Sequence, residues 1–229
     1  MLSKSIYLLI NAVIIIFPLL LSFENKLIFY KKIPQLLISL IIVGIPFLIW
    51  DVFATARGDW GFNPSYTLNI KLLGLPIEEI LFFFTVPYAI LFLYETFLYY
   101  IPNNKQGIQY NLFIIPSLLS FLTAYICSEK SYTLIVLLIF SFTSLLLAIT
   151  KPIFLKQKYF GLFILFTFIP FGIVNFILTS LPVVYYNQKA IWGIRISNIP
   201  LEDFIYSFSL ISLYVFFYEL AKGKWVIND

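Results

Sequence analysis

Two pairs of neighbouring acids are the side chains in this sequence most suited to chemistry. Each pair belongs to the pattern Pro-x-Glu-acid; they are Glu78 with Glu79, and Glu202 with Asp203. Acids in the first turn of a helix are also favoured by the helix dipole, so ordinary helix capping is the competing interpretation. The chain has only eleven acids, and two matched pairs argue against capping alone. Crowded, poorly solvated carboxyl groups keep at least one proton, so they could serve as a proton donor and a proton acceptor.

The two motifs belong to an internal repeat. A shift of 124 positions places Lys71 to Glu79 over Arg195 to Asp203, and the same shift places Asp51 over Asn175 without a gap. Each copy contains three apolar stretches, and one extra stretch between the copies restores the original direction across a membrane. We therefore expect two parallel three-helix repeats joined by a linking helix, with both acid motifs on the same side of the membrane.

The elements that must hold these acids are membrane-spanning helices. Of the 229 residues, 61% are hydrophobic and 11% are charged, whereas a soluble domain carries roughly 25% charged residues. We predict an all-α integral membrane protein with about seven transmembrane helices, since about 20 apolar residues cross a bilayer. The domains are expected at 1–100, 101–128 (the linking helix) and 129–229. The predicted spans are 6–23, 34–55, 77–100, 109–127, 131–150, 159–179 and 200–221.

Several kinds of chemistry are excluded by the composition. The chain has no histidine and a single cysteine, Cys127, so it has no imidazole acid or base, no His-ligated metal and no thiolate cluster. Its nine glycines form neither dinucleotide-binding fingerprint. We predict no metal and no cofactor from these residues. The net charge of +4 is interpreted as loop charge, and no nucleic-acid partner is expected.

Helical spacing from each motif suggests what surrounds the acids. Asp51, near the end of its span, lies on the same side as the first motif and needs a partner or a cavity, because a charge inside a membrane is costly. In each half an acid is followed by a hydroxyl one or two turns deeper, within an aromatic wall. These neighbours are Phe82 and Thr85 in the first half, and Tyr206 and Ser209 in the second, with Asn175 replacing Asp51.

Such a site suits proton-initiated chemistry on a hydrocarbon. One acid would protonate an alkene, and a neighbouring carboxylate would later remove a different proton. The carbocation between these steps would be quenched by water, so a dry aromatic pocket would both protect and stabilise it. The reaction has no net redox change.

The sequence resembles the lycopene cyclase domain family in its fused tandem form, over nearly the whole chain. The residues that carry the resemblance are Trp50-Asp51, Ala54-x-Ala56-x-Gly58-x-Trp60, Leu75-Pro76-Ile77-Glu78-Glu79, Tyr94-Glu95, Ile199-Pro200-Leu201-Glu202-Asp203 and Tyr218-Glu219. The second half departs from the pattern, since residues 181–184 lack the Arg-Gly-Asp-Trp of residues 57–60.

The resemblance implies a membrane lycopene β-cyclase, an isomerase that converts lycopene through γ-carotene to β-carotene. Glu78 and Glu202 are the first candidates for proton donor and acceptor, with Glu79 and Asp203 supporting or exchanging those roles and Asp51 tuning them. Trp50 joins the residues named above as substrate-binding. Dependence on a flavin or a nicotinamide is left open. The implied partners are lycopene, membrane lipids and other enzymes of carotenoid synthesis, in a bacterial cell membrane.

Two alternatives stay open. A membrane prenyltransferase would use the acids to hold Mg²⁺ against a diphosphate, but such sites favour Asp-rich D-x-x-x-D spacing and several nearby cations. A small transporter with parallel repeats would move its substrate without converting it.

Tyr94 with Glu95, and their counterparts in the second half, lie about 24 Å along the helix from the inner acids, where we expect them to mark the opposite membrane face.

Overall fold

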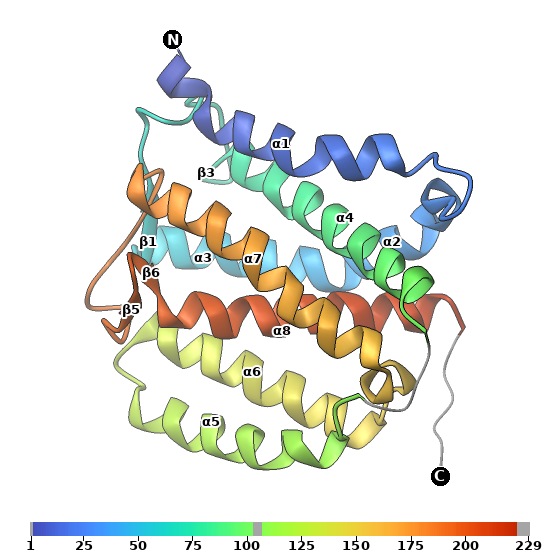
Figure 1. Cartoon of the computed structure of the whole chain (residues 1–229). Helices are drawn as coiled ribbons and strands as arrows, with labels where there is room; N and C mark the ends of the chain where they lie inside the picture. The colour runs from blue at the N-terminus through green and yellow to red at the C-terminus, as the bar shows by residue number, and fades with distance from the viewer. Residues whose placement is uncertain (1, 103–106, 224–229) are drawn as a thin grey trace.

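The computed structural model describes residues 2–102 and 107–223 and shows a bundle of helices that run roughly side by side (Figure 1). Within these residues, six helical segments are long and apolar enough to cross a membrane, and Tyr110–Ile126 is a shorter apolar one. This confirms the predicted all-α membrane protein. The helices are α1 (Ile6–Leu21), α2 (Ile33–Ser39), α3 (Ile45–Arg57), α4 (Ile77–Tyr100), α5 (Ile114–Ile126), α6 (Ser131–Thr150), α7 (Lys158–Ser180) and α8 (Leu201–Ala221).

Helices α2 and α3 form a single crossing, Phe29–Arg57, joined by a π-helical turn at Leu40–Gly44. The turn ends two residues before Pro46, whose ring would clash with a carbonyl of the preceding turn and which has no N–H to donate. A π turn relieves this conflict by adding a residue to the helix. Helix α7, in contrast, continues as an α-helix through the equivalent residue, Pro170.

The two long connections, residues 58–76 between α3 and α4 and residues 181–200 between α7 and α8, contain short strands. The strands are β1 (Trp60–Phe62), β2 (Lys71–Leu72), β3 (Leu75–Pro76), β4 (Val184–Tyr186), β5 (Arg195–Ile196) and β6 (Ile199–Pro200). Strands β2 and β3 form a hairpin that leads into α4, and β5 and β6 form one that leads into α8. The strands were not anticipated because two-residue strands leave no alternating pattern in the sequence.

The repeat is visible in individual backbone bonds. In one hairpin Lys71 pairs with Pro76, and in the other Arg195 pairs with Pro200, in the same register. The bond from Ile77 N to Ile70 O, 2.9 Å long, has its counterpart 124 residues later, from Leu201 N to Ile194 O. Both hairpins therefore set the start and the direction of the next helix in the same way, and Figure 1 shows α4 and α8 beginning at the same end of the bundle.

The two halves also pair with each other directly. Strands β1 and β4, which are equivalent in the repeat, form an antiparallel sheet with Gly61 opposite its own counterpart Tyr185. The pseudo-two-fold axis therefore passes between these two residues. A Cβ atom on Gly61 would lie 2.5 Å from the Tyr185 hydroxyl, so glycine lets the exposed Tyr185 ring lie directly against the backbone here.

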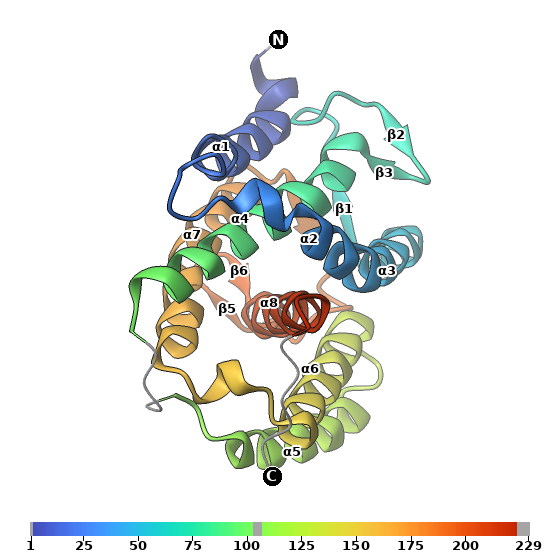
Figure 2. The ribbon, with the colours of Figure 1, turned by 90° about the vertical axis from the view of Figure 1, so that its right-hand side faces the viewer.

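Helix α8 lies near the middle of the bundle, with α2, α4, α6 and α7 packed around it (Figure 2). The packing follows the repeat, because α1 packs on α4 as α6 packs on α8, and α2 contacts α8 as α7 contacts α4. The linking helix α5 packs on α6 at the outside. The domain boundaries at 100 and 128 stay a prediction.

Because the halves are related by symmetry, the second acid of each motif, Glu79 or Asp203, faces the space between the two halves.

Candidate functional site

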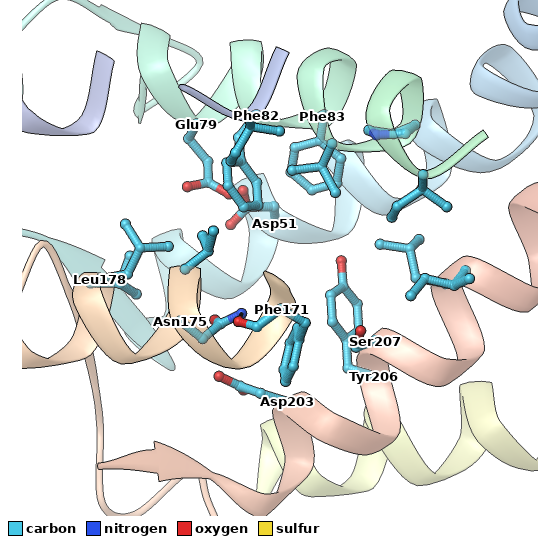
Figure 3. Close-up of a pocket in the computed structure, with 18 of the residues that line it drawn as sticks. Asp51, Glu79, Phe82, Phe83, Phe171, Asn175, Leu178, Asp203, Tyr206 and Ser207 are labelled. Carbon is cyan, nitrogen blue, oxygen red and sulfur yellow. Dashed lines mark hydrogen bonds between the residues drawn. The ribbon is translucent and has the colours of Figure 1, made fainter. Parts of the chain in front are cut away.

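A cavity of about 250 Å³ lies between the two halves and receives side chains from α1, α3, α4, α7 and α8. Its walls are mainly apolar and aromatic, and the carboxyl groups that line it are Asp51, Glu79 and Asp203. On α4 the lining runs from Glu79 to Leu93, a length of about 21 Å at 1.5 Å per residue. The cavity is thus an elongated apolar space with three acids towards one end (Figure 3).

Asp51 and Glu79 form the acidic group of the first half. Their carboxyl groups approach one another in Figure 3. Asp51 Oδ1 also accepts bonds from Trp60 Nε1 at 2.9 Å and from Thr55 Oγ1 at 3.2 Å. The Tyr7 hydroxyl donates to Glu79 Oε2. Two neighbouring buried carboxylates repel each other, so this proximity favours a proton on one of them.

Asp203 is the acidic group of the second half and has different partners. The Tyr132 hydroxyl donates to Oδ1 at 2.6 Å, and the Tyr186 hydroxyl donates to Oδ2 at 2.8 Å. Tyr186 lies on β4, outside the membrane-spanning helices, and burial together with the negative charge of Asp203 raises its pKa well above the usual value. The phenol therefore stays protonated and keeps donating to the carboxylate. Asn175, the counterpart of Asp51, lies near Asp203 (Figure 3).

Aromatic rings form the wall beside the acids. Trp50 is the central ring, with centroids 5.3 Å from Trp60, 5.6 Å from Tyr206 and 6.0 Å from Tyr132. All four rings line the cavity. Electron-rich ring faces attract a cation, so this wall can stabilise positive charge next to the carboxyl groups.

Glu78 and Glu202 lie outside the residues that line the cavity. Each is buried and accepts a bond from the loop before its hairpin: Glu78 Oε1 from Leu68 N at 2.6 Å, and Glu202 Oε1 from Trp192 N at 2.5 Å. These bonds are equivalent in the repeat and hold each loop against its helix. The other carboxylate oxygen of each residue has no hydrogen-bonding partner within 2–102 and 107–223.

The predicted substrate-binding residues divide in the same way. Trp50, Phe82, Asn175 and Tyr206 line the cavity, whereas Thr85 and Ser209 do not. Thr85 donates to Asn11 Oδ1 at 2.7 Å, and Ser209 donates to the Ile205 carbonyl at 2.8 Å. Counting helical turns from the second acid of each motif gives the observed stripe: Glu79, Phe82, Phe83, Val86, Ile90 and Leu93 on α4, and Asp203, Tyr206, Ser207, Leu210 and Tyr214 on α8.

Three tyrosines at the site were not anticipated. Tyr7 and Tyr132 are equivalent partners of Glu79 and Asp203, but they are related by a shift of 125 rather than 124. A gapless comparison therefore hides them. Tyr186 comes from the unpredicted strand β4. No group of three or more His, Cys, Asp or Glu side chains suited to a metal ion occurs in the parts of the chain described.

A separate charged cluster lies at the other end of the bundle. Glu95 accepts bonds from Lys32 Nζ at 2.5 Å, Lys222 Nζ at 2.7 Å and Tyr218 OH at 2.8 Å, and Lys222 also bonds Glu219 at 2.7 Å. Burial alone would lower the pKa of Lys222, but the negative charges of Glu219 and Glu95 raise it above its usual value. The cluster ties the ends of α2, α4 and α8 together.

We expect Glu95→Gln to destabilise the protein. The Glu95 side chain is 3% exposed, and removing its charge leaves two lysines short of a partner, so the free energy of unfolding should fall by about 3 kcal/mol. Thermal unfolding of the purified protein in detergent measures this. The matched control is Glu219→Gln, which should cost less because Lys222 keeps Glu95. Equal losses in the two variants would contradict this account of the cluster.

The comparisons with known proteins agree with the duplicated site. A sequence model of the lycopene cyclase family matches residues 4–97 and again residues 129–221. Comparison with curated proteins and with solved structures gave no match. The two matched segments cover most of the chain and contain all three carboxyl groups of the cavity. The chain therefore belongs to the lycopene cyclase family and carries its domain twice in tandem, as a multi-pass membrane enzyme of carotenoid cyclisation.

Proposed function

We propose that this protein is a lycopene β-cyclase, an isomerase that forms β-ionone rings at the acyclic ends of lycopene, by way of γ-carotene, in a bacterial cell membrane. The observation that carries the proposal is the convergence of three carboxyl groups from both halves at one end of an elongated, aromatic-lined cavity. A long polyene could lie along the apolar stripe with one end beside the acids. Membrane lipids would supply the surroundings, and other carotenoid enzymes would supply the substrate and take the product.

The chemistry follows from acids in a dry space. A carboxylic acid protonates the terminal alkene of lycopene and leaves a tertiary carbocation. The π electrons of a nearer alkene attack this centre, close a six-membered ring and leave a second tertiary cation inside it. A carboxylate then removes a proton from the carbon that has just formed the new ring bond, which gives the ring double bond conjugated to the polyene. One proton enters and one leaves, so the product is an isomer.

The surroundings supply what these steps need. Trp50 and Tyr206 present ring faces beside the acids, where the cation forms. The apolar walls keep water away from the cation, which water would otherwise capture. Asp51, Glu79 and Asp203 are proposed to carry the proton transfers. Glu78 and Glu202, the first candidates by sequence, are proposed instead to hold the loops that precede the hairpins.

Expression in bacterial cells that accumulate lycopene tests the activity. We expect pigment analysis to show conversion of lycopene to monocyclic and then bicyclic β-ring products. Unchanged lycopene, with the protein verified in the membrane, would contradict the proposal. Release of diphosphate from a prenyl diphosphate in the presence of magnesium would favour a prenyltransferase, and substrate flux without conversion would favour a transporter.

A further inference from the structure

We infer that the two sides of the cavity divide the proton chemistry, with Glu79, supported by Asp51, as the proton donor and Asp203 as the proton acceptor. This inference rests on the proposed function and adds the direction in which the proton moves. It depends on the hydrogen-bonding partners of each carboxyl group, which differ between the two halves.

The first half is built to hold a proton. Asp51 Oδ1 receives two donors, from Trp60 and Thr55, which stabilise Asp51 as the carboxylate. Asp51 Oδ2 is buried and has no hydrogen-bonding partner among the described residues, so a protonated Glu79 could donate to it. The proton of this pair is therefore assigned to Glu79, which as an acid still accepts the Tyr7 hydroxyl on Oε2. Since Glu79 lines the cavity, this proton can reach an alkene there.

The second half is built to hold a negative charge. Both oxygens of Asp203 accept a phenolic hydroxyl, one from Tyr132 and one from Tyr186. These bonds favour the carboxylate over the acid, because an acid would have to give up at least one of the two donors. Asp203 also lines the cavity, so it can receive a proton from a substrate placed between the two sides.

The departure of the second half from the repeat now has a chemical reason. Where the first half has Asp51, the second has Asn175, whose Nδ2 donates to the Phe171 carbonyl at 3.2 Å. A neutral amide cannot share a proton with Asp203 as a second carboxylate would. The half with two acids keeps a proton, and the half with a single acid presents a base.

The proton balance closes over one turnover. Glu79 gives its proton to the terminal alkene, and Asp203 takes a proton from the carbon that has formed the new ring bond, whose C–H electrons become the ring double bond. After the product leaves, Glu79 lacks a proton and Asp203 holds one, and exchange with water restores both. No oxidant or reductant is consumed. Tyr132 and Tyr186 act as positioning residues, because they bind Asp203 and orient it.

Turnover in D₂O tests the direction of transfer. Membranes that contain the wild-type protein and lycopene should introduce a single deuterium per ring. Asp203→Asn should form few normal rings but still transfer deuterium, which would appear in recovered acyclic substrate or in ring isomers. Glu79→Gln should neither form rings nor transfer deuterium, and Asp51→Asn should also reduce deuterium transfer. Mass spectrometry of the extracted carotenoids measures both effects.

The outcomes separate the two proposals. If wild-type membranes leave lycopene acyclic and unlabelled, the proposed function fails. If the wild type forms rings but Glu79→Gln transfers deuterium while Asp203→Asn does not, or if both lose the transfer equally, the division of roles is overturned. Thermal unfolding of each variant shows whether a loss of activity reflects misfolding. A further variant, Asn175→Asp, tests the assignment by adding a carboxyl group instead of removing one.

The Asn175→Asp variant should lower ring formation at least about 10-fold, because a second carboxyl group beside Asp203 would hold a proton there. Deuterium transfer from the unchanged first half should persist. The double variant Tyr132→Phe with Tyr186→Phe should likewise raise the ratio of deuterium transfer to ring formation. A variant that folds and keeps the wild-type ratio would contradict the role given to these partners.

Discussion

Glu79→Gln is expected to reduce ring formation by at least about 100-fold, the contribution typical of a general acid. The same change one residue earlier, Glu78→Gln, should cost much less. Glutamine at 78 can still accept the bond from Leu68 N that holds the loop, whereas glutamine at 79 has no acidic proton to give to a substrate. Initial rates of cyclisation in membranes with matched protein levels measure the difference.

The second half offers the same comparison. Asp203→Asn should remove most ring formation, while Glu202→Gln should keep the bonds from Thr133 and Trp192 and lose less. Agreement between the two halves would tie the effect to the second acid of each motif. Large losses in Glu78→Gln and Glu202→Gln, with nearly normal rates in the other two variants, would restore the roles expected from sequence.

Adjacent acids on a helix cannot be ranked from sequence. Glu78 and Glu79 are one residue apart and point about 100° away from each other around the axis. Which of them faces the cavity depends on how α4 is rotated, and that rotation is set by contacts far away in the chain, such as Asn11 Nδ2 with the Glu78 carbonyl at 3.1 Å. The repeat and the motif were predictable, and the rotation was not.

The two predicted hydroxyl contacts were wrong because helical turns were counted from the first acid of each motif. Counting from Glu78 and Glu202 led to Thr85 and Ser209, which bond within or between helices instead of lining the cavity. The same count from the second acid leads to Val86 and Leu210, which do line it. A shift of one residue moves the whole stripe by about 100°, so a single choice decided two predicted contacts.

The tyrosines around the acids were out of reach for a different reason. Tyr7 and Tyr132 fall out of register by a single residue relative to the motifs, so the gapless repeat places Tyr7 on Ser131. Tyr186 reaches Asp203 from a strand that exists because its counterpart from the other half pairs with it. The pairing of β1 with β4 depends on how the two halves pack against each other, and the sequence of one repeat alone does not determine that packing.

A cavity shared by both halves predicts that the two ends of lycopene are cyclised one at a time. The duplication does not provide two equivalent sites here, because Asp51 with Glu79 from one half and Asp203 from the other line the same space. The acids lie towards one end of it, so a substrate that has formed one ring must leave and return with its other end first.

Monocyclic γ-carotene should therefore appear before β-carotene and accumulate while lycopene is in excess. When membranes are given labelled lycopene and then a large excess of unlabelled lycopene, the labelled monocyclic product should stay monocyclic for longer, because it competes with fresh substrate for the same cavity. Bicyclic product at the earliest times, with labelled material converted fully despite the excess, would mean that both ends react in one encounter. That result would require a second acid and base at the far end of the substrate. In the described part of the chain, the far end of the bundle offers Glu95 and Glu219, which are already ion-paired with lysine, and Glu24, whose Oε2 accepts a bond from Leu27 N.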